Sequence, residues 1–339
     1  MTRRQMLLAA ASITPMLAGA AGGPFEVDLK TLPFARRGGI DLMVDLYLPR
    51  GTADKVPTVL FLHGGGWTGG TRTTGPDFRR FFAREGFAMA SIEYRLTPGV
   101  RFPSNVEDVK TAIRWLRANA TEHRLNGKVG IWGTSAGGHL AAMAALTPRG
   151  VFEGDGSLEQ PATVDCVLNA YGPSSFLVMD AQTEAEKSGL QALPASLVTP
   201  GRGGGPGSVK HDAPNSAESN LVGAPIQSVP ELVRAASPLT YVKAGAPPFL
   251  LMHGLADNSV PHHQSVMLYE ALAAAGNDVT LRLIDGLPHT FFNRPNLDET
   301  AGPFRMDVRV HPRGGTESKR EERAGVFDVA RDFFAKHLA

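Results

Sequence analysis

The sequence predicts an α/β fold in which a mainly parallel central sheet is covered by helices on both faces. Short apolar segments recur along the 339 residues and alternate with segments of helical periodicity, which is the order typical of parallel sheets. A hydrophobic content of 42% with 20% charged residues fits a globular chain with a large core. Two polar excursions, at about 172–232 and about 293–322, interrupt this order after predicted strands, and we interpret them as a loop or cap insertion and an extended loop.

The elements are predicted in the following order. Two strands flank Gly38-Gly39, a turn sequence that predicts an antiparallel hairpin at an edge of the sheet. The hairpin strands and the later, more apolar strands are expected at 26–37, 40–48, 56–63, 87–94, 129–134, 164–170, 248–253 and 278–284. Helical spacing of apolar residues predicts helices at 75–85, 105–120, 139–145, 264–275 and 324–337.

The first twenty residues have the composition of a secretory signal peptide. Arg3 and Arg4 precede an apolar stretch that ends in the small residues 18–20, so we expect cleavage before Ala21 and a mature domain over 21–339. The paired arginines resemble a twin-arginine export signal of a bacterial protein, and the alternatives are an ordinary Sec signal or an uncleaved anchor. The sequence therefore predicts a secreted or periplasmic protein without stable membrane insertion after signal removal.

Charge and cysteine content narrow the classes of partner. Lys and Arg number 34 against 33 Asp and Glu, and this near-zero balance gives no reason to expect nucleic acid as a partner. Cys166 is the single cysteine, which excludes an intramolecular disulfide and a cysteine metal cluster. The histidine spacing does not suggest a zinc site, so we expect neither a metal nor an organic cofactor.

Ser135 stands at the centre of a G-x-S-x-G sequence between a predicted strand and a predicted helix. Gly133 and Gly137 flank it where a Cβ would collide as the strand turns back onto the helix. A serine at such a turn projects its hydroxyl above the carboxyl end of the sheet, beside the N–H groups of the helix N-terminus. Ser135 is therefore the candidate nucleophile, and a plain tight connection is the alternative.

A serine nucleophile needs a base and an orienting carboxylate, and both are found downstream. Asp257 follows the apolar strand at 248–253, and His289 follows the next strand. Both are therefore expected at the carboxyl ends of their strands, the same edge of the sheet where Ser135 is expected. The order Ser, Asp, His is the one expected for an α/β-hydrolase. Asp285 is the alternative acid, four residues from His289, and the other histidines are expected to be structural, at the surface, or at the start of the helix at 264–275.

Three main-chain amides are candidates for an oxyanion hole. Gly64, Gly65 and Gly66 follow the strand at 56–63, and residues without side chains let the backbone approach a substrate closely. The N–H groups of Gly65, Gly66 and Ala136 can therefore converge on one oxygen. A flexible glycine linker is the alternative.

Five separated motifs occur in the order of a known family: HGGGW at 63–67, EYRL at 93–96, WGTSAGGHLA at 132–141, ASPLTYV at 236–242 and PPFLLMHGLADNSVP at 247–261. Together they resemble α/β-hydrolase carboxylesterases, in particular the hormone-sensitive-lipase-like esterases and the feruloyl and acetyl esterases of plant polysaccharides. The resemblance covers most of 40–290. It departs at Thr290, where the family usually has glycine, and at Leu255, where an acidic residue is common.

The resemblance implies a serine ester hydrolase of short-chain or carbohydrate-linked esters. It implies Ser135 as nucleophile, Asp257 as acid, His289 as base, and Gly65, Gly66 and Ala136 as oxyanion donors, in agreement with the residue patterns. An amidase or peptidase with the same triad is the alternative, because acyl-transfer machinery does not dictate the leaving group. A non-catalytic binding protein on a hydrolase scaffold is a remote alternative.

Overall fold

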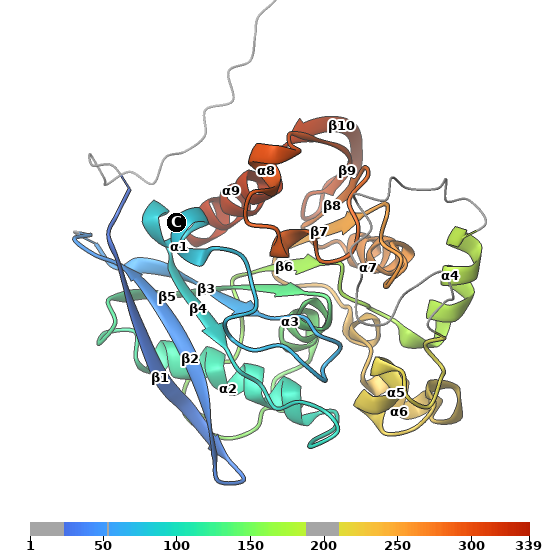
Figure 1. The fold of residues 1–339 in the computed structure, drawn as a ribbon, viewed down its shortest axis with the longest axis horizontal. Helices are drawn as coiled ribbons and strands as arrows, with labels where there is room; N and C mark the ends of the chain where they lie inside the picture. The colour runs from blue at the N-terminus through green and yellow to red at the C-terminus, as the bar shows by residue number, and fades with distance from the viewer. Residues whose placement is uncertain (1–23, 53, 188–209) are drawn as a thin grey trace, which may run out of the picture.

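The computed structural model describes residues 24–52, 54–187 and 210–339, and their strands form one ten-stranded sheet (Figure 1). The strand order is β1-β2-β4-β3-β5-β6-β7-β8-β9-β10. The six central strands run parallel: β4 (Ala88–Ile92), β3 (Val56–Leu62), β5 (Leu125–Thr134), β6 (Cys166–Ala170), β7 (Phe249–Gly254) and β8 (Val279–Ile284). The mainly parallel sheet predicted from the apolar segments is confirmed.

An antiparallel hairpin forms one edge of the sheet. Strands β1 (Val27–Arg37) and β2 (Ile40–Pro49) pair in the register Arg37 to Ile40, and β2 continues antiparallel onto β4. Gly38 and Gly39 both adopt positive φ, 54° and 84°, which is the conformation that a two-residue type I′ turn requires. The hairpin predicted from this glycine pair is confirmed.

Two hydrophobic cores lie on opposite faces of the sheet, because neighbouring residues of each strand point to opposite sides. Ile131 of β5 packs into one core and Trp132 into the other. The first core is covered by α2 (Ser104–Ala118), α3 (Ala136–Leu146) and α7 (His263–Ala274), and the second by α1 (Phe78–Phe81) and α9 (Val326–Leu338) (Figure 1). Helices on both faces are therefore confirmed.

The helix expected over 75–85 is shorter than predicted. Asp77 caps α1 by accepting the N–H of Arg80, and Phe82 leaves the helical region at φ −135°, so the chain continues as a short 3-10 turn at Ala83–Glu85. The aromatic spacing nevertheless predicts the packing, because Phe78 and Phe82 are buried in the second core. Phe81 stacks on Phe327 of α9 at 3.8 Å between ring centroids.

The prediction of an extended loop over 293–322 is wrong for most of this range. After α8 (Leu297–Thr300) the chain forms β9 (Phe304–His311) and β10 (Ser318–Ala324), which extend the sheet antiparallel to β8. In β9 the alternate residues Phe304, Met306 and Val308 are buried, while the intervening residues are charged and lower the mean hydropathy. Edge strands tolerate charged side chains, which explains how the polar β10 belongs to the sheet. Because Ala324 pairs with Phe304, α9 begins at Val326.

The insertion expected over about 172–232 is described except for 188–209, which lies outside the described residues. Its described parts form a 3-10 turn at Phe176–Val178, α4 (Met179–Lys187), α5 (Ala217–Val222), a 3-10 turn at Ile226–Ser228 and α6 (Pro230–Ala235). Phe176, Leu221 and Val233 from these parts are fully buried in the first core. The described insertion is thus a folded layer beside α3. The signal peptide predicted over 1–20 also lies outside the described residues.

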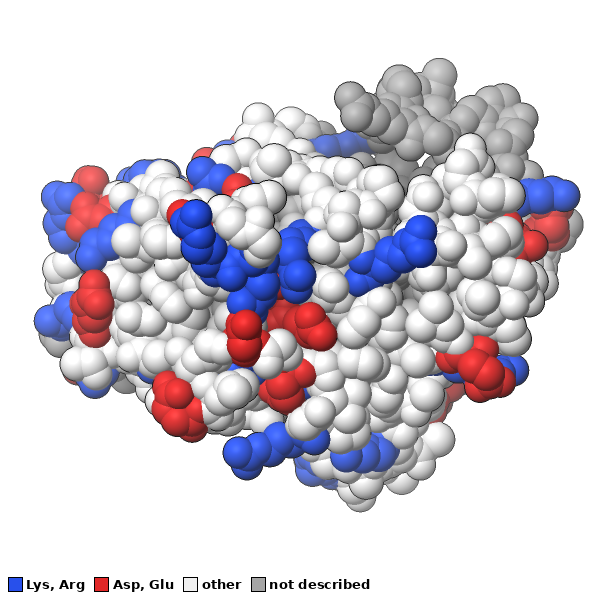
Figure 2. Space-filling model, turned by 90° about the horizontal axis from the view of Figure 1, so that it is seen from below, with Lys and Arg blue, Asp and Glu red and all other residues white. Residues whose placement is uncertain are grey.

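The molecular surface combines both signs of charge. Figure 2 shows Lys and Arg side chains next to Asp and Glu side chains on one face, separated by wide uncharged areas. Exposed ion pairs include Arg305 with Glu321 at 2.9 Å. In the described ranges no helix has both the length and the apolar character that crossing a bilayer demands.

Candidate active site

Ser135 occupies the strained turn between β5 and α3. Its φ is 54°, a region that non-glycine residues seldom adopt, and its N–H donates to the Ala170 carbonyl of β6 at 2.9 Å. A Cβ at Gly133 would lie 2.0 Å from the Gly137 carbonyl oxygen, and one at Gly137 would lie 2.1 Å from the Leu62 carbonyl oxygen. Both glycines of the motif are therefore required by the close approach of β5, α3 and β3.

The structure brings the three predicted triad residues together. Ser135 Oγ lies 2.9 Å from His289 Nε2, and His289 Nδ1 lies 2.6 Å from Asp257 Oδ2. A carboxylate only accepts, so Nδ1 carries the hydrogen and Nε2 is left to accept the hydrogen of the serine hydroxyl. The alternative acid Asp285 is exposed and lies near Arg305 at 3.9 Å.

The environment of Asp257 keeps its carboxylate ionised. Burial raises the pKa of Asp257, but the neighbouring His289 and the hydrogen bonds from His253 and His289 outweigh it and hold the pKa well below its usual range. The second oxygen, Oδ1, accepts the N–H groups of Ser259 and Val260 at 2.8 and 2.9 Å. The loop after β7 therefore fixes the orientation of the acid.

A second histidine, His253, shares this carboxylate and is a partner that the sequence reasoning missed. It is fully buried at the end of β7, and its Nε2 lies 3.1 Å from Asp257 Oδ2 and 3.0 Å from the Val260 carbonyl. Both partners are acceptors, so Nε2 carries the hydrogen, while Nδ1 accepts the hydroxyl of Ser265 at 2.8 Å. The spacing of His253 four residues before Asp257, in HGLAD, was the available signal.

Replacing His253 by Phe keeps an aromatic ring but removes the donor to Asp257. A hydrogen bond to a charged group contributes about 1.5–3 kcal/mol, so a partial loss of alignment is expected to lower kcat by about tenfold or more with KM changed less than about twofold. Steady-state kinetics on a chromogenic ester measure both constants. His253→Gln retains an N–H donor and should keep more activity than His253→Phe; equal kcat in all three proteins would contradict the positioning role.

The predicted oxyanion loop has a backbone that only glycine adopts readily. Gly65 and Gly66 have φ of 118° and 60°, and a Cβ at Gly65 would lie 2.2 Å from the Gly69 carbonyl oxygen. No acceptor among the described residues receives the N–H of Gly65 or Gly66, and Ala136 is the first residue of α3, where amides lack an intrahelical partner. These three amides are thus available to a bound oxygen.

A buried polar chain anchors this loop to the nucleophile helix. Trp67 Nε1 donates to His139 Nδ1 of α3 at 3.2 Å, and His139 Nε2 donates to the Ala236 carbonyl at 2.7 Å. Burial lowers the pKa of His139 to about 4, so the ring is neutral at neutral pH and both contacts are satisfied. His139 is thus a structural histidine, one of the roles expected for the histidines outside the triad.

His139 makes stability depend on pH. Its folded pKa of about 4 lies below the ordinary value of 6.5, so the unfolded chain binds more protons between these values and stability falls as pH drops through this window. Between about pH 7.5 and about pH 5 the wild type is expected to lose about 2 kcal/mol more unfolding free energy than His139→Gln. Urea unfolding at the two pH values measures the difference; identical pH dependence would contradict the prediction.

Two neighbours shape the surroundings of His289. The ring of Tyr171 packs against its imidazole at 4.8 Å between centroids, in an edge arrangement. Thr290, which stands where the resembled family has glycine, adopts φ 62°, the left-handed conformation that favours glycine. The family preference therefore has a conformational cause, and Thr290 accommodates the same turn under strain.

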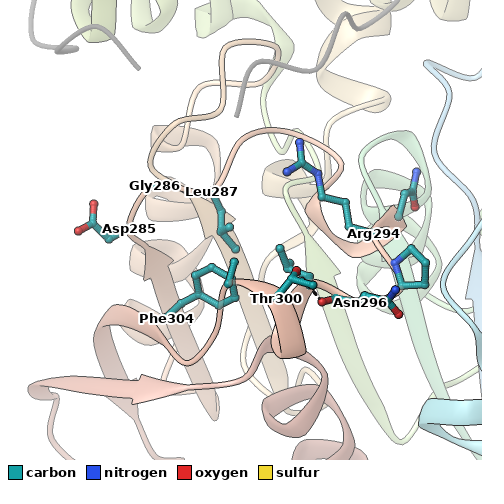
Figure 3. Close-up of a pocket in the computed structure, with 11 residues that line it drawn as sticks. Asp285, Gly286, Leu287, Arg294, Asn296, Thr300 and Phe304 are labelled. Atoms are coloured by element: carbon teal, nitrogen blue, oxygen red, sulfur yellow. Dashed lines mark hydrogen bonds between the residues drawn. The ribbon is translucent and has the colours of Figure 1, made fainter. Parts of the chain in front are cut away.

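The segment after His289 lines a cavity of about 730 Å³ (Figure 3). Leu287 and Phe304 form part of its wall, Arg294 and Asn296 face it from the β8–β9 connection, and Thr300 Oγ1 donates to the Asn296 carbonyl at 2.8 Å (Figure 3). The triad residues do not line this cavity.

Among the described residues, the one cluster with the spacing of metal ligands is Glu186, His262 and His263, which also contains no triad member.

The parallel sheet, the strained serine turn and the Ser-His-Asp arrangement at the strand ends define an α/β-hydrolase. The chain belongs to the BD-FAE family, whose model matches residues 44–272. Esterase LipC of Mycobacterium tuberculosis is 30% identical over 239 residues, which cover 69% of this chain and 53% of LipC. Carboxylesterase NlhH of the same species is 36% identical over 118 residues, 34% of this chain and 36% of NlhH.

The similarity to solved structures extends over nearly the whole fold. An esterase of Thermogutta terrifontis, in a butyrate-bound structure, has a TM-score of 0.64 at 23% identity and covers 92% of this chain and 95% of its own. A truncated carbohydrate esterase from gut microbiota has a TM-score of 0.64 at 24% identity, covering 94% and 99%. The chain spans about half the length of curated relatives that it matches, such as LipC and esterase LipQ of the same species.

Proposed function

We propose that the chain is a serine carboxylic-ester hydrolase that acts through an acyl-enzyme. The observation that carries the proposal is the continuous hydrogen-bonded relay from Ser135 Oγ through His289 to Asp257, with separations of 2.9 and 2.6 Å. Membership of the BD-FAE family and the names of the related esterases support it. No step of this chemistry requires a metal or an organic cofactor.

Acylation uses each group in the order in which the relay connects them. Ser135 Oγ attacks the ester carbonyl as His289 Nε2 takes its proton, and Asp257 stabilises the imidazolium that forms. The developing oxyanion accepts the N–H groups of Gly65, Gly66 and Ala136, whose positions are fixed before substrate binds. Collapse of the intermediate releases the alcohol, which receives the proton from His289.

Deacylation repeats this cycle with water. His289 Nε2 takes a proton from water as the oxygen attacks the acyl carbon, and the oxyanion returns to the same amides. Collapse then returns the proton to Ser135 Oγ and releases the acid. Because Asp257 stays ionised and is held by two main-chain N–H groups, it can orient His289 in both half-reactions.

The substrate class is proposed from the sequence resemblance as short-chain or carbohydrate-linked acyl esters. The described insertion lies against the oxyanion loop, since a Cβ at Gly66 would lie 3.0 Å from the Ala217 Cβ of α5. A wall this close to the oxyanion donors favours a compact acyl group. An amidase with the same triad is the competing activity, because the relay is indifferent to the leaving group.

Ser135→Ala is expected to reduce kcat on p-nitrophenyl butyrate by roughly 10⁵–10⁶-fold, the scale of nucleophile removal in serine hydrolases. A fluorophosphonate should label wild type but not the variant, as read by intact mass. Acetyl, butyryl, octanoyl and feruloyl esters, with acetylated xylan, define the acyl preference. Retained hydrolysis by Ser135→Ala would overturn the assignment, and faster turnover of a matched amide than of its ester would favour the amidase.

We propose that the protein is exported and that Ala21 begins the mature chain. The basic start, the apolar stretch and the small residues at 18–20 support this proposal. Expression in a bacterial host should place the protein outside the cytoplasm, with an N-terminus at Ala21 by mass spectrometry. Arg3→Lys combined with Arg4→Lys is expected to abolish export if the twin-arginine route operates and to leave it nearly unchanged for Sec; an uncleaved cytoplasmic product of the wild type would contradict export.

A further inference from the structure

A compact group of three side chains with metal-binding atoms lies at the contact between α4 and α7. Glu186 comes from the end of α4, while His262 and His263 are consecutive at the start of α7. His262 Nδ1 lies 3.2 Å from Glu186 Oε2, and His263 Nδ1 lies 2.5 Å from Glu186 Oε1. The three ligand atoms all lie within 4.8 Å of one another.

These separations suit a small transition-metal ion. Zinc binds imidazole nitrogen and carboxylate oxygen at about 2.0–2.2 Å, so two ligands of one tetrahedral ion lie about 3.3–3.6 Å apart. Small rotations of the three side chains reach this spacing from the observed one. Two imidazoles with one carboxylate also form a donor set that suits borderline-soft divalent ions better than calcium or magnesium.

The carboxylate is held in place by the surrounding contacts. The Glu186 side chain is only 7% exposed, and its two oxygens accept the N–H groups of His262 and His263 at 3.3 and 3.1 Å. Gln264, one residue further along α7, donates to Gln182 of α4 at 2.6 Å and so braces the same contact. The Glu186 carboxylate is thus positioned before any ion arrives, which lowers the cost of ordering a site.

The charge and access of the group also fit a cation. Two main-chain N–H groups point at the Glu186 oxygens, and such donors favour the charged form of a carboxylate. His262 and His263 are 22% and 48% exposed, so an ion and its remaining water ligands can reach them from solvent. Capping of α7 by Glu186 explains the two main-chain contacts, but it does not require two imidazoles on the same carboxylate.

We propose that Glu186, His262 and His263 form a binding site for a divalent transition-metal ion of the zinc type, with the remaining positions filled by water. Each Nδ1 must present a lone pair to the ion, so both rings adopt the tautomer with the hydrogen on Nε2. The ion replaces the two side-chain hydrogen bonds by coordination. It clamps α4 of the insertion to α7, directly after the loop that carries Asp257.

The test uses the mature chain without an affinity tag, freed of metal by a chelator and dialysed against Zn²⁺. One equivalent is expected to bind, and the affinity should fall at least tenfold in His263→Asn and in Glu186→Gln. His337→Asn, on α9, is the matched control for a histidine outside the cluster and should bind like wild type. Circular dichroism and thermal unfolding in chelator establish that each variant is folded.

Two further measurements separate this site from others. Saturating Zn²⁺ should raise the unfolding temperature of wild type and His337→Asn but not of the two cluster variants, because binding to the native state stabilises it. Wild type labelled at Ser135 by a fluorophosphonate should still bind one equivalent, which separates this site from the triad histidine. Absence of stoichiometric binding, equal affinity in the cluster variants, or loss of binding after labelling would overturn the proposal.

Discussion

The close approach of β5, α3 and β3 around Ser135 is the constraint on which the rest of the site depends. Gly133 and Gly137 have no room for a side chain, and the turn between them holds Ser135 at positive φ. This strain is maintained because the flanking strand and helix lie in the core of the sheet, and the Ala170 carbonyl holds the serine amide. The hydroxyl and the first amides of α3 are consequently presented at the same edge.

A second organising feature is the sharing of one buried carboxylate between two histidines. His289 uses Asp257 Oδ2 for the proposed chemistry, and His253 uses the same oxygen while it binds the end of the acid loop and α7. The loop is therefore fixed from both sides of its acid. In the proposed enzyme, the residues at the strand ends orient His289, whose side chain remains 14% exposed and can meet substrate.

The sequence predictions succeeded and failed for identifiable physical reasons. The hairpin around Gly38-Gly39 and the buried strands were predictable because their signals are local in sequence. The strand at Phe304–His311 was missed because charged residues alternate with its buried ones at the sheet edge. The helix expected over 75–85 was too long, because α1 spans only Phe78–Phe81 and a 3-10 turn follows at Ala83–Glu85. The role of His253 was missed because whether its ring meets the Asp257 carboxylate, only four residues further on, depends on the path of the loop after β7.

The sequence by itself predicted the first eight strands in their order along the chain, the serine turn and the candidate triad of Ser135, Asp257 and His289. Each of these depends on short-range patterns and on the chemistry of the residue type. Tertiary structure decided which groups meet. The 2.9 and 2.6 Å relay distances, the sharing of Asp257 and the meeting of Glu186 with two histidines join segments separated by up to 154 positions. Such contacts depend on which strand ends and helices lie side by side in the folded chain, and no local pattern encodes this.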